Sequence, residues 1–297
     1  MSQEYGQLEA LQVTVLLEEN AGYNSSFLAQ HGMSLLLEAW HGGSKPGKRT
    51  ILFDTGQSAQ PVLHNMQLLG KDPQDIDLIF LSHCHYDHTG GLVGILEASK
   101  RCRVPIVGHP SIYRPHFSLK PTFQSLGMSP DCSREAIEKA GGELILSADP
   151  MPLMPGAVST GEINDRVSFE KSPTLSLQTI HEGKKVSDYM VDDSSLIFIT
   201  EEGLIIITGC SHAGITSIVE AAVRLTGIEH VSALIGGFHL VDADQARISR
   251  TVQTITSMEV DNIYAGHCTG FKAEANLFME LGERFQKLHT GMTIKYQ

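Results

Sequence analysis

One short segment restricts the folds open to this chain more than any other feature: the run His83-x-His85-x-Asp87-His88. It directly follows an apolar stretch at 76–81, typical of a strand buried on both faces, and it precedes a predicted helix. In extended backbone, residues two apart point to the same side, so His83 and His85 face one point. Asp87 and His88 lie where the chain turns and can face a neighbouring point. Burying these groups without a cation would be costly, so the segment predicts a metal site suited to zinc, manganese or iron.

Composition restricts the function classes. The chain has 297 residues with 22 Lys plus Arg against 34 Asp plus Glu, a formal net charge of −12. Phosphate backbones and anionic lipids need clustered cations, so we expect neither a nucleic-acid nor a membrane partner. Hydrophobic residues make up 41% and charged residues 19%, which is enough for a substantial core.

Histidine and cysteine usage add to this picture. Fourteen histidines are about double the usual share, and five cysteines are an odd number. We therefore expect reduced thiols rather than a disulfide framework. Residues 1–6 have neither the basic nor the apolar region of a secretory signal, so a cytoplasmic location is expected.

Strand-like and helix-like patterns alternate along both halves of the chain. Strands are expected at 12–17, 34–39, 50–53, 76–81, 104–107, 204–208, 231–235, 262–265 and 292–296. Helices are expected at 61–69, 91–99, 133–140, 215–225, 243–258 and 273–282. Two β-rich halves, each ended by helices, predict one α/β domain over 1–297 with helices outside two sheets. The segment from about 109 to 166 is rich in Pro, Ser, Gly and Met and predicts an irregular insert that faces substrate.

The run from His83 to His88 resembles the signature of the metallo-β-lactamase superfamily. This resemblance implies an αββα four-layer sandwich, two mixed β-sheets flanked by helices, with two metal ions at the sheet edges. Asp54 matches the early aspartate of the superfamily, which implies that it orients and strengthens the metal ligands. His267 matches the late histidine that completes the second metal site.

The chain departs from the superfamily pattern at the ligand that usually bridges the metals. Cys210 stands where the bridging aspartate is expected, and His212 follows two residues later. We expect His212 to supply an imidazole that is absent from its usual place. Cys210 is either a ligand, which would favour zinc or iron, or a small buried hydrophobe. Asp192 or Asp193 is the alternative ligand.

Other histidines are less constrained by the sequence. His239 follows two glycines at the end of another predicted strand, and a metal role or a catalytic contact with substrate stays open. His31, His109 and His116 are expected to be ordinary polar residues, with a substrate contact as the alternative for the last two.

The expected ligands form two sets of three: His83, His85 and His212 for one metal, and Asp87, His88 and His267 for the other. Two cations can activate water or hold a departing diphosphate, and Asp87 would orient the nucleophile or accept its proton. The expected function is a metal-dependent hydrolase or transferase acting on a small phosphate- or diphosphate-bearing molecule. A non-catalytic metal- or ligand-binding module is the alternative, and homo-oligomer formation stays open.

Several phrases narrow the resemblance to one subgroup. The phrases around Gly32, Cys210, His239 and His267 are similar to those of 7,8-dihydropterin-6-yl-methyl-4-(β-D-ribofuranosyl)aminobenzene 5′-phosphate synthases. This resemblance implies a transferase that joins a pterin methyl diphosphate to an aryl amine, with loss of diphosphate.

Overall fold

Two seven-stranded sheets form the centre of the molecule. The computed structural model describes residues 5–42, 46–171 and 177–297, so most of the N-terminal segment considered above (residues 1–4) lies outside the described residues. In spatial order, the first sheet consists of β18 (Thr293–Tyr296), β1 (Ala10–Leu17), β2 (Ser34–His41), β3 (Gly47–Phe53), β4 (Leu78–Phe80), β5 (Val104–Gly108) and β8 (Gly142–Leu146). The second consists of β17 (Phe285–Lys287), β16 (Asn262–Gly266), β15 (Val231–Gly237), β14 (Gly203–Ile207), β13 (Leu196–Thr200), β10 (Ala157–Ser159) and β9 (Pro152–Met154).

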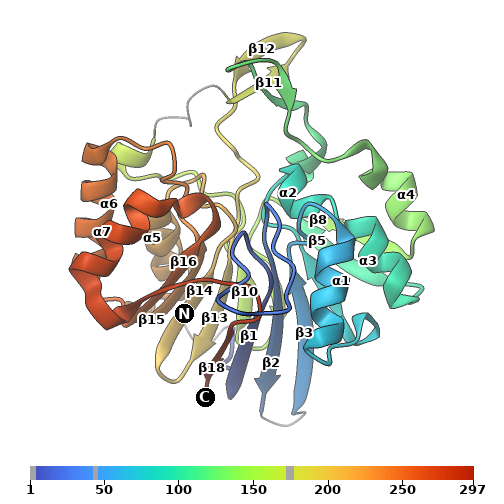
Figure 1. Cartoon of the computed structure of the whole chain (residues 1–297), viewed down its shortest axis with the longest axis horizontal. Helices are drawn as coiled ribbons and strands as arrows, with labels where there is room; N and C mark the ends of the chain where they lie inside the picture. The colour runs from blue at the N-terminus through green and yellow to red at the C-terminus, as the bar shows by residue number, and fades with distance from the viewer. Residues whose placement is uncertain (1–4, 43–45, 172–176) are drawn as a thin grey trace.

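Helices cover the outer face of each sheet (Figure 1). The first sheet is covered by α1 (Ala59–Leu68), α3 (Leu92–Ser99) and α4 (Arg134–Lys139). The second is covered by α5 (Ile215–Thr226), α6 (Gln245–Ser257) and α7 (Phe271–Leu281). The four-layer αββα architecture expected from the resemblance is confirmed. Among the described residues, no helix combines the length and the apolar character that crossing a bilayer requires.

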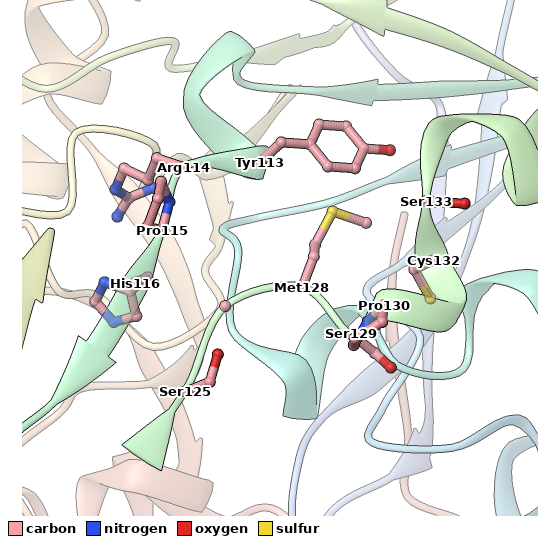
Figure 2. A pocket seen from close by; sticks show the side chains of 11 residues that line it. Tyr113, Arg114, Pro115, His116, Ser125, Met128, Ser129, Pro130, Cys132 and Ser133 are labelled. Carbon is pink, nitrogen blue, oxygen red and sulfur yellow. The ribbon is translucent and has the colours of Figure 1, made fainter. Parts of the chain in front are cut away.

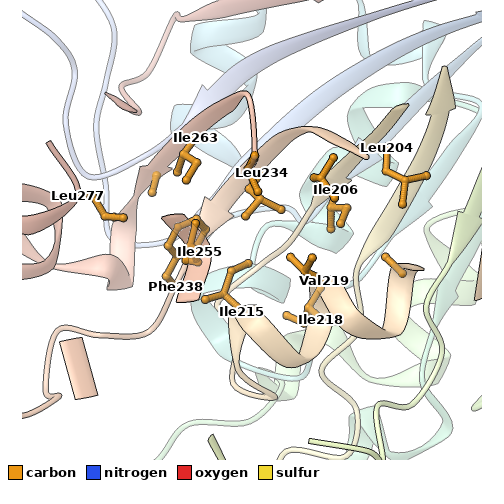
Figure 3. Close-up of a cluster of buried hydrophobic side chains, with 14 of the residues drawn as sticks. Leu204, Ile206, Ile215, Ile218, Val219, Leu234, Phe238, Ile255, Ile263 and Leu277 are labelled. Carbon is orange, nitrogen blue, oxygen red and sulfur yellow. The ribbon is translucent and has the colours of Figure 1, made fainter. Parts of the chain in front are cut away.

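Side chains along a strand point alternately to the two faces of the sheet, so the second sheet contributes to two hydrophobic cores. On β14, Ile206 packs towards α5 and α6, whereas Ile205 and Ile207 pack against the first sheet. Figure 3 shows the helix-facing cluster, in which Ile206 and Leu234 lie over α5. Because both faces of β14 are buried, its sequence is a continuous apolar run rather than an alternating one.

The segment at 109–166 contributes more to the sheets than expected. β8 pairs in parallel with β5, and β10 pairs with β13, so both belong to the main sheets. The prediction of a largely irregular insert was too broad here, because these strands are short and lie among Gly and Pro residues. A separate four-stranded sheet does leave the sandwich: β7 (Gln124–Ser125), β6 (His116–Ser118), β11 (Leu177–His181) and β12 (Lys184–Ser187). We call it the flap; β11 and β12 stand above the sandwich in Figure 1.

Candidate metal centre

The histidine-rich segment lies at the carboxyl end of β4, between the sheet and the short helix α2 (Tyr86–Thr89). β3, β4 and β5 are parallel, so their carboxyl ends meet at one edge of the first sheet. His83 and His88 are fully buried there, and Asp87 is 4% exposed. The segment packs tightly against the residues that follow β3, since a Cβ on Gly91 would lie 2.1 Å from the Thr55 carbonyl oxygen.

The second half of the chain supplies the opposite wall from β14, β15 and β16, which are also parallel. Cys210 and His212 follow β14, His239 follows β15, and His267 follows β16. The two walls are in close contact, because a Cβ on Gly209 would lie 2.2 Å from the Ser82 hydroxyl oxygen. The structure therefore brings the sequence-predicted residues from both halves to one place.

Cys210 and Asp87 each place a candidate ligand atom close to His88 and His267. His88 Nε2, His267 Nε2 and Cys210 Sγ lie 3.2 Å from one another. Asp87 Oδ2 is 3.4 Å from each of the two nitrogens. Ligands bound to a tetrahedral zinc ion at about 2.0–2.3 Å are separated by about 3.3–3.7 Å, so this set fits a cation such as zinc. Cys210 thus lies among the expected ligands of the second metal.

Hydrogen bonds fix which nitrogen of His83 and His88 faces this centre. Asp54 Oδ2 accepts hydrogen bonds from His88 Nδ1 and from the Ser82 hydroxyl, both at 2.7 Å. Since the Ser82 hydroxyl hydrogen goes to Asp54, its oxygen accepts from His83 Nδ1 at 2.8 Å. His83 Nε2 is then left with a lone pair, and it is buried without a partner. Asp54 contacts the histidines as expected for a residue that orients ligands.

A second set of imidazoles faces a neighbouring point. His83, His85 and His212 each offer a ligand atom within 4.8 Å of the others. Both ring nitrogens of His212 are buried and have no hydrogen-bond partner. Unpaired buried nitrogens cost about 1–3 kcal/mol each, and a bound cation would remove that cost. The donor set therefore fits a divalent metal here as well.

His116, on β6 of the flap, orients His85. The two Nε2 atoms are 2.7 Å apart, and His116 Nδ1 is 2.8 Å from Asp188 Oδ2. Because the carboxylate accepts from His116 Nδ1, the other nitrogen accepts from His85 and leaves His85 Nδ1 free for a cation. Figure 2 shows His116 beside Arg114, whose guanidinium donates to Asp188 at 2.7 Å. No sequence pattern indicated this chain of contacts, since Asp188 is 72 residues from His116.

The alternative ligands Asp192 and Asp193 both make structural contacts, although Asp193 Oδ1 is buried without a hydrogen-bond partner. Asp192 accepts from the Cys84 backbone amide at 2.8 Å and forms an ion pair with Arg114 at 2.7 Å. Asp193 accepts from the Ala213 amide at 2.7 Å. Both carboxylates hold the walls of the centre together, and neither belongs to the ligand groups found among the described residues.

Burial and neighbouring charged groups shift the pKa values of the histidines in the centre. Burial, together with the neighbouring His88 and His85, lowers the pKa of His83 well below its usual range. Burial also opposes protonation of His88, but the Asp87 and Asp54 carboxylates outweigh it and raise the pKa to about 9. The raised pKa favours a proton on His88 where a cation would bind, so metal binding would release that proton.

A cavity of about 340 Å³ opens onto the centre, and flap residues form part of its wall. Its lining includes His85, Asp87, Cys210 and His267, together with Lys120 and Gln124 from the flap. His31 and His239 also line it, whereas His109 does not. His31 pairs with Glu19, whose carboxylate also lies 3.2 Å from His267 Nδ1. His31 therefore belongs to the site, contrary to the expectation of an ordinary loop residue.

Several site residues have strained backbone. Asp54, Ser211, His239 and His267 have φ angles between 45° and 59°. Residues other than glycine rarely adopt this left-handed conformation, which costs about 1–3 kcal/mol and is concentrated at functional sites. The strain coincides with the strand ends that carry the candidate ligands.

The fold is that of the metallo-beta-lactamase superfamily, to which the chain belongs. The model of that superfamily matches residues 38–149. A Methanocaldococcus jannaschii protein named 7,8-dihydropterin-6-methyl-4-(beta-D-ribofuranosyl)-aminobenzene-5′-phosphate synthase is 46% identical over the full length of both chains. A second, uncharacterised protein of that organism is 31% identical over 88% of this chain and 92% of its own.

Solved structures agree on the fold. A metal-dependent hydrolase of the beta-lactamase superfamily aligns with a TM-score of 0.77 and 23% identity, over 96% of this chain and 98% of its own. YhfI of Bacillus subtilis, a metallo-beta-lactamase fold protein, aligns with a TM-score of 0.56 and 14% identity, over 97% of this chain and 99% of its own. The superfamily match and the full-length relative named as a synthase show that the chain is an enzyme of a superfamily that typically binds divalent metals.

Proposed function

We propose that the centre binds two divalent cations, with zinc as the main candidate. His83, His85 and His212 would hold the first, and Asp87, His88, Cys210 and His267 the second. The spacing of the second group, close to that of a tetrahedral zinc site, supports this assignment. A thiolate among the ligands favours zinc over magnesium or manganese.

The cations would supply positive charge for a phosphate or diphosphate group, which the chain itself provides sparsely. Lys120 is the one lysine or arginine among the described residues that line the cavity, and Glu19, Asp87 and Asp242 line it too. An anionic substrate would therefore depend on the metal-loaded centre for binding. The flap, which carries Lys120, would close over the remainder of the substrate and set specificity.

We propose further that the enzyme is a pterin-linked aminobenzene-phosphate synthase. The observation that carries this proposal is 46% identity over the whole chain with a relative of that name. In the reaction, the aryl amine nitrogen would form a bond to the pterin methyl carbon as the carbon–oxygen bond to diphosphate breaks. The amine gives up one proton, and Asp87, which lines the cavity, would orient the amine or accept that proton.

A direct assay separates synthase from hydrolase. Zinc-loaded protein is incubated with dihydropterin methyl diphosphate and ribofuranosylaminobenzene phosphate, and the coupled product and free diphosphate are quantified. We expect both to appear in equal amounts and only when both substrates are present. Diphosphate released at the same rate without the amine would identify a hydrolase instead, and metal binding without any turnover would identify a binding module.

The ligand assignment has its own measurement. A His83→Ala, His85→Ala double variant should lose the cation of the first group, as counted by elemental analysis. The matched control is His64→Ala, His230→Ala, which alters two histidines outside the cavity lining. A double variant with the full wild-type metal content would overturn the assignment independently of the reaction catalysed.

A further inference from the structure

Cys210, His239 and Cys268 form a cluster that the two-cation centre does not account for. Their ligand atoms, two sulfurs and one imidazole nitrogen, all lie within 4.8 Å of one another. All three residues line the cavity. They follow β14, β15 and β16 in turn, so the three parallel strands deliver them to the same edge of the second sheet.

The backbone at Gly237 and His239 allows the three side chains to approach one another. Gly237 precedes it on β15, and a Cβ at that position would lie 2.7 Å from Cys268 Sγ. A side chain here would displace the thiol, so glycine is required for the sulfur to approach the strand. His239 has a left-handed φ of 45°, which turns its ring back towards the cavity wall at an energetic cost.

The ring nitrogens of His239 lack partners that would explain its position. Both Nδ1 and Nε2 are buried, and neither forms a hydrogen bond. The Cys268 thiol donates a long hydrogen bond of 3.5 Å to the Cys210 carbonyl oxygen, and it also lies in contact with the Cys210 and His239 side chains. An imidazole with two buried nitrogens beside two thiols is a set of donor atoms suited to a cation.

We propose that Cys210, His239 and Cys268 bind a third cation, a thiophilic divalent ion such as zinc or cadmium. Two thiolates and one imidazole are the donors that such ions prefer over magnesium or calcium. Both cysteines would bind as thiolates, and the charge of the Cys210 thiolate would be shared with the second cation. Three protein ligands leave one coordination position open, and it faces the cavity.

Cys210 joins this third site to the centre already described. Its sulfur is 3.2 Å from both His88 Nε2 and His267 Nε2. A thiolate sulfur can bind two cations at once, so Cys210 bridges the second and third cations. His239 is then a metal ligand, which replaces the direct catalytic role considered from the sequence.

The test is a count of cobalt(II) bound to the full chain, prepared under reducing conditions and freed of excess metal. Compared with wild type, Cys268→Ser and His239→Ala should each bind one equivalent fewer. Cys268→Ser should also lose about two thirds of the sulfur-to-cobalt charge-transfer absorbance, since of three sulfur–cobalt bonds only the one from Cys210 to the second cation remains. The matched control is Cys102→Ser, an exposed cysteine, which should retain all of both signals.

Each result of these measurements leads to a different conclusion. Unchanged cobalt content and absorbance in Cys268→Ser and His239→Ala would overturn the proposal. A loss in Cys268→Ser without one in His239→Ala would also contradict it, because His239 would then lie outside the site. Circular dichroism verifies folding, and His239→Gln replaces His239→Ala if the latter does not fold. His83→Ala should lose a different equivalent and keep the charge-transfer band, so failure of the two-cation centre is recognised independently.

Discussion

Asp54 Oδ2 lies 2.7 Å from His88 Nδ1, and both side chains are completely buried. The same carboxylate accepts hydrogen bonds from the backbone amide and the hydroxyl of Ser82. One residue at the end of β3 thus sets the orientation of two imidazoles that come from the segment after β4. This contact joins the ligands to the rigid part of the sheet, as second-layer partners of metal ligands commonly do.

Asp54→Asn should therefore weaken metal binding by about 10–100-fold, because an amide orients and polarises His88 less than a carboxylate does. Competition with a fluorescent zinc chelator measures the change. Asp261→Asn is the matched control, since Asp261 contacts His230 at 2.9 Å in an exposed pair. Equal zinc affinity in Asp54→Asn and wild type would refute the supporting role.

His116→Ala should lower the affinity for the first cation by about tenfold, because His85 would lose the partner that fixes its tautomer. Asp188→Asn should have an effect in the same direction, and His116→Gln should recover part of it by accepting from His85. Titration with cobalt(II) gives the affinities. His109→Ala is the control, a buried histidine of the same segment that lies outside the cavity; an equal loss there would indicate a general packing effect.

Gly32→Ala should destabilise the protein by about 3 kcal/mol or more and impair metal binding. Gly32 has a φ of 117°, and a Cβ there would lie 2.1 Å from the Asp87 carbonyl oxygen. Gly70→Ala is the control, since Gly70 has a φ of 65° but open space around it, and should cost about 1 kcal/mol. Urea denaturation measures both; similar costs would show that the contact with Asp87 is relieved by a small shift.

Glu38→Gln should lower stability by about 1 kcal/mol at pH 7 and by progressively less as the pH falls below 4.5. Burial would raise the pKa of Glu38, but the ion pairs with Lys48 and Lys71 outweigh it and hold the pKa below its ordinary value of 4.5. The native state thus favours the ionised form, so the contribution is present above pH 4.5 and is lost as the pH falls through the lowered pKa. Thermal unfolding of both proteins across this range tests the sign, and a difference that grows in acid would contradict it.

Periodicity and local spacing were sufficient for much of the architecture. Every expected strand and helix overlaps one in the structure, because long apolar runs such as β14 and amphipathic helices such as α5 leave few alternatives. The short strands β8 to β10 were not found, since three to five residues among turns carry little periodic signal. Their place is set by pairing with β5 and β13, which are distant in the sequence.

The candidate site likewise contains residues that the sequence could predict and residues that it could not. The segment from His83 to His88 was predictable because its ligands are neighbours in the chain. His116, Asp188 and Glu19 were not, because they act through partners that only the folded chain brings near. The question left open at Asp192 and Asp193 depended on which backbone amides and cations face them, and that is a property of the tertiary structure.

The ligand atoms come from both halves of the chain, with His88 beside the first sheet and His267 and Cys210 beside the second. Cations bound between them would hold together two sheets that are otherwise joined mainly by apolar packing. Stripping the metal would then do more than abolish chemistry: it would loosen the sandwich along the rim where substrate enters, and supply of metal in the cell would govern how long the protein survives.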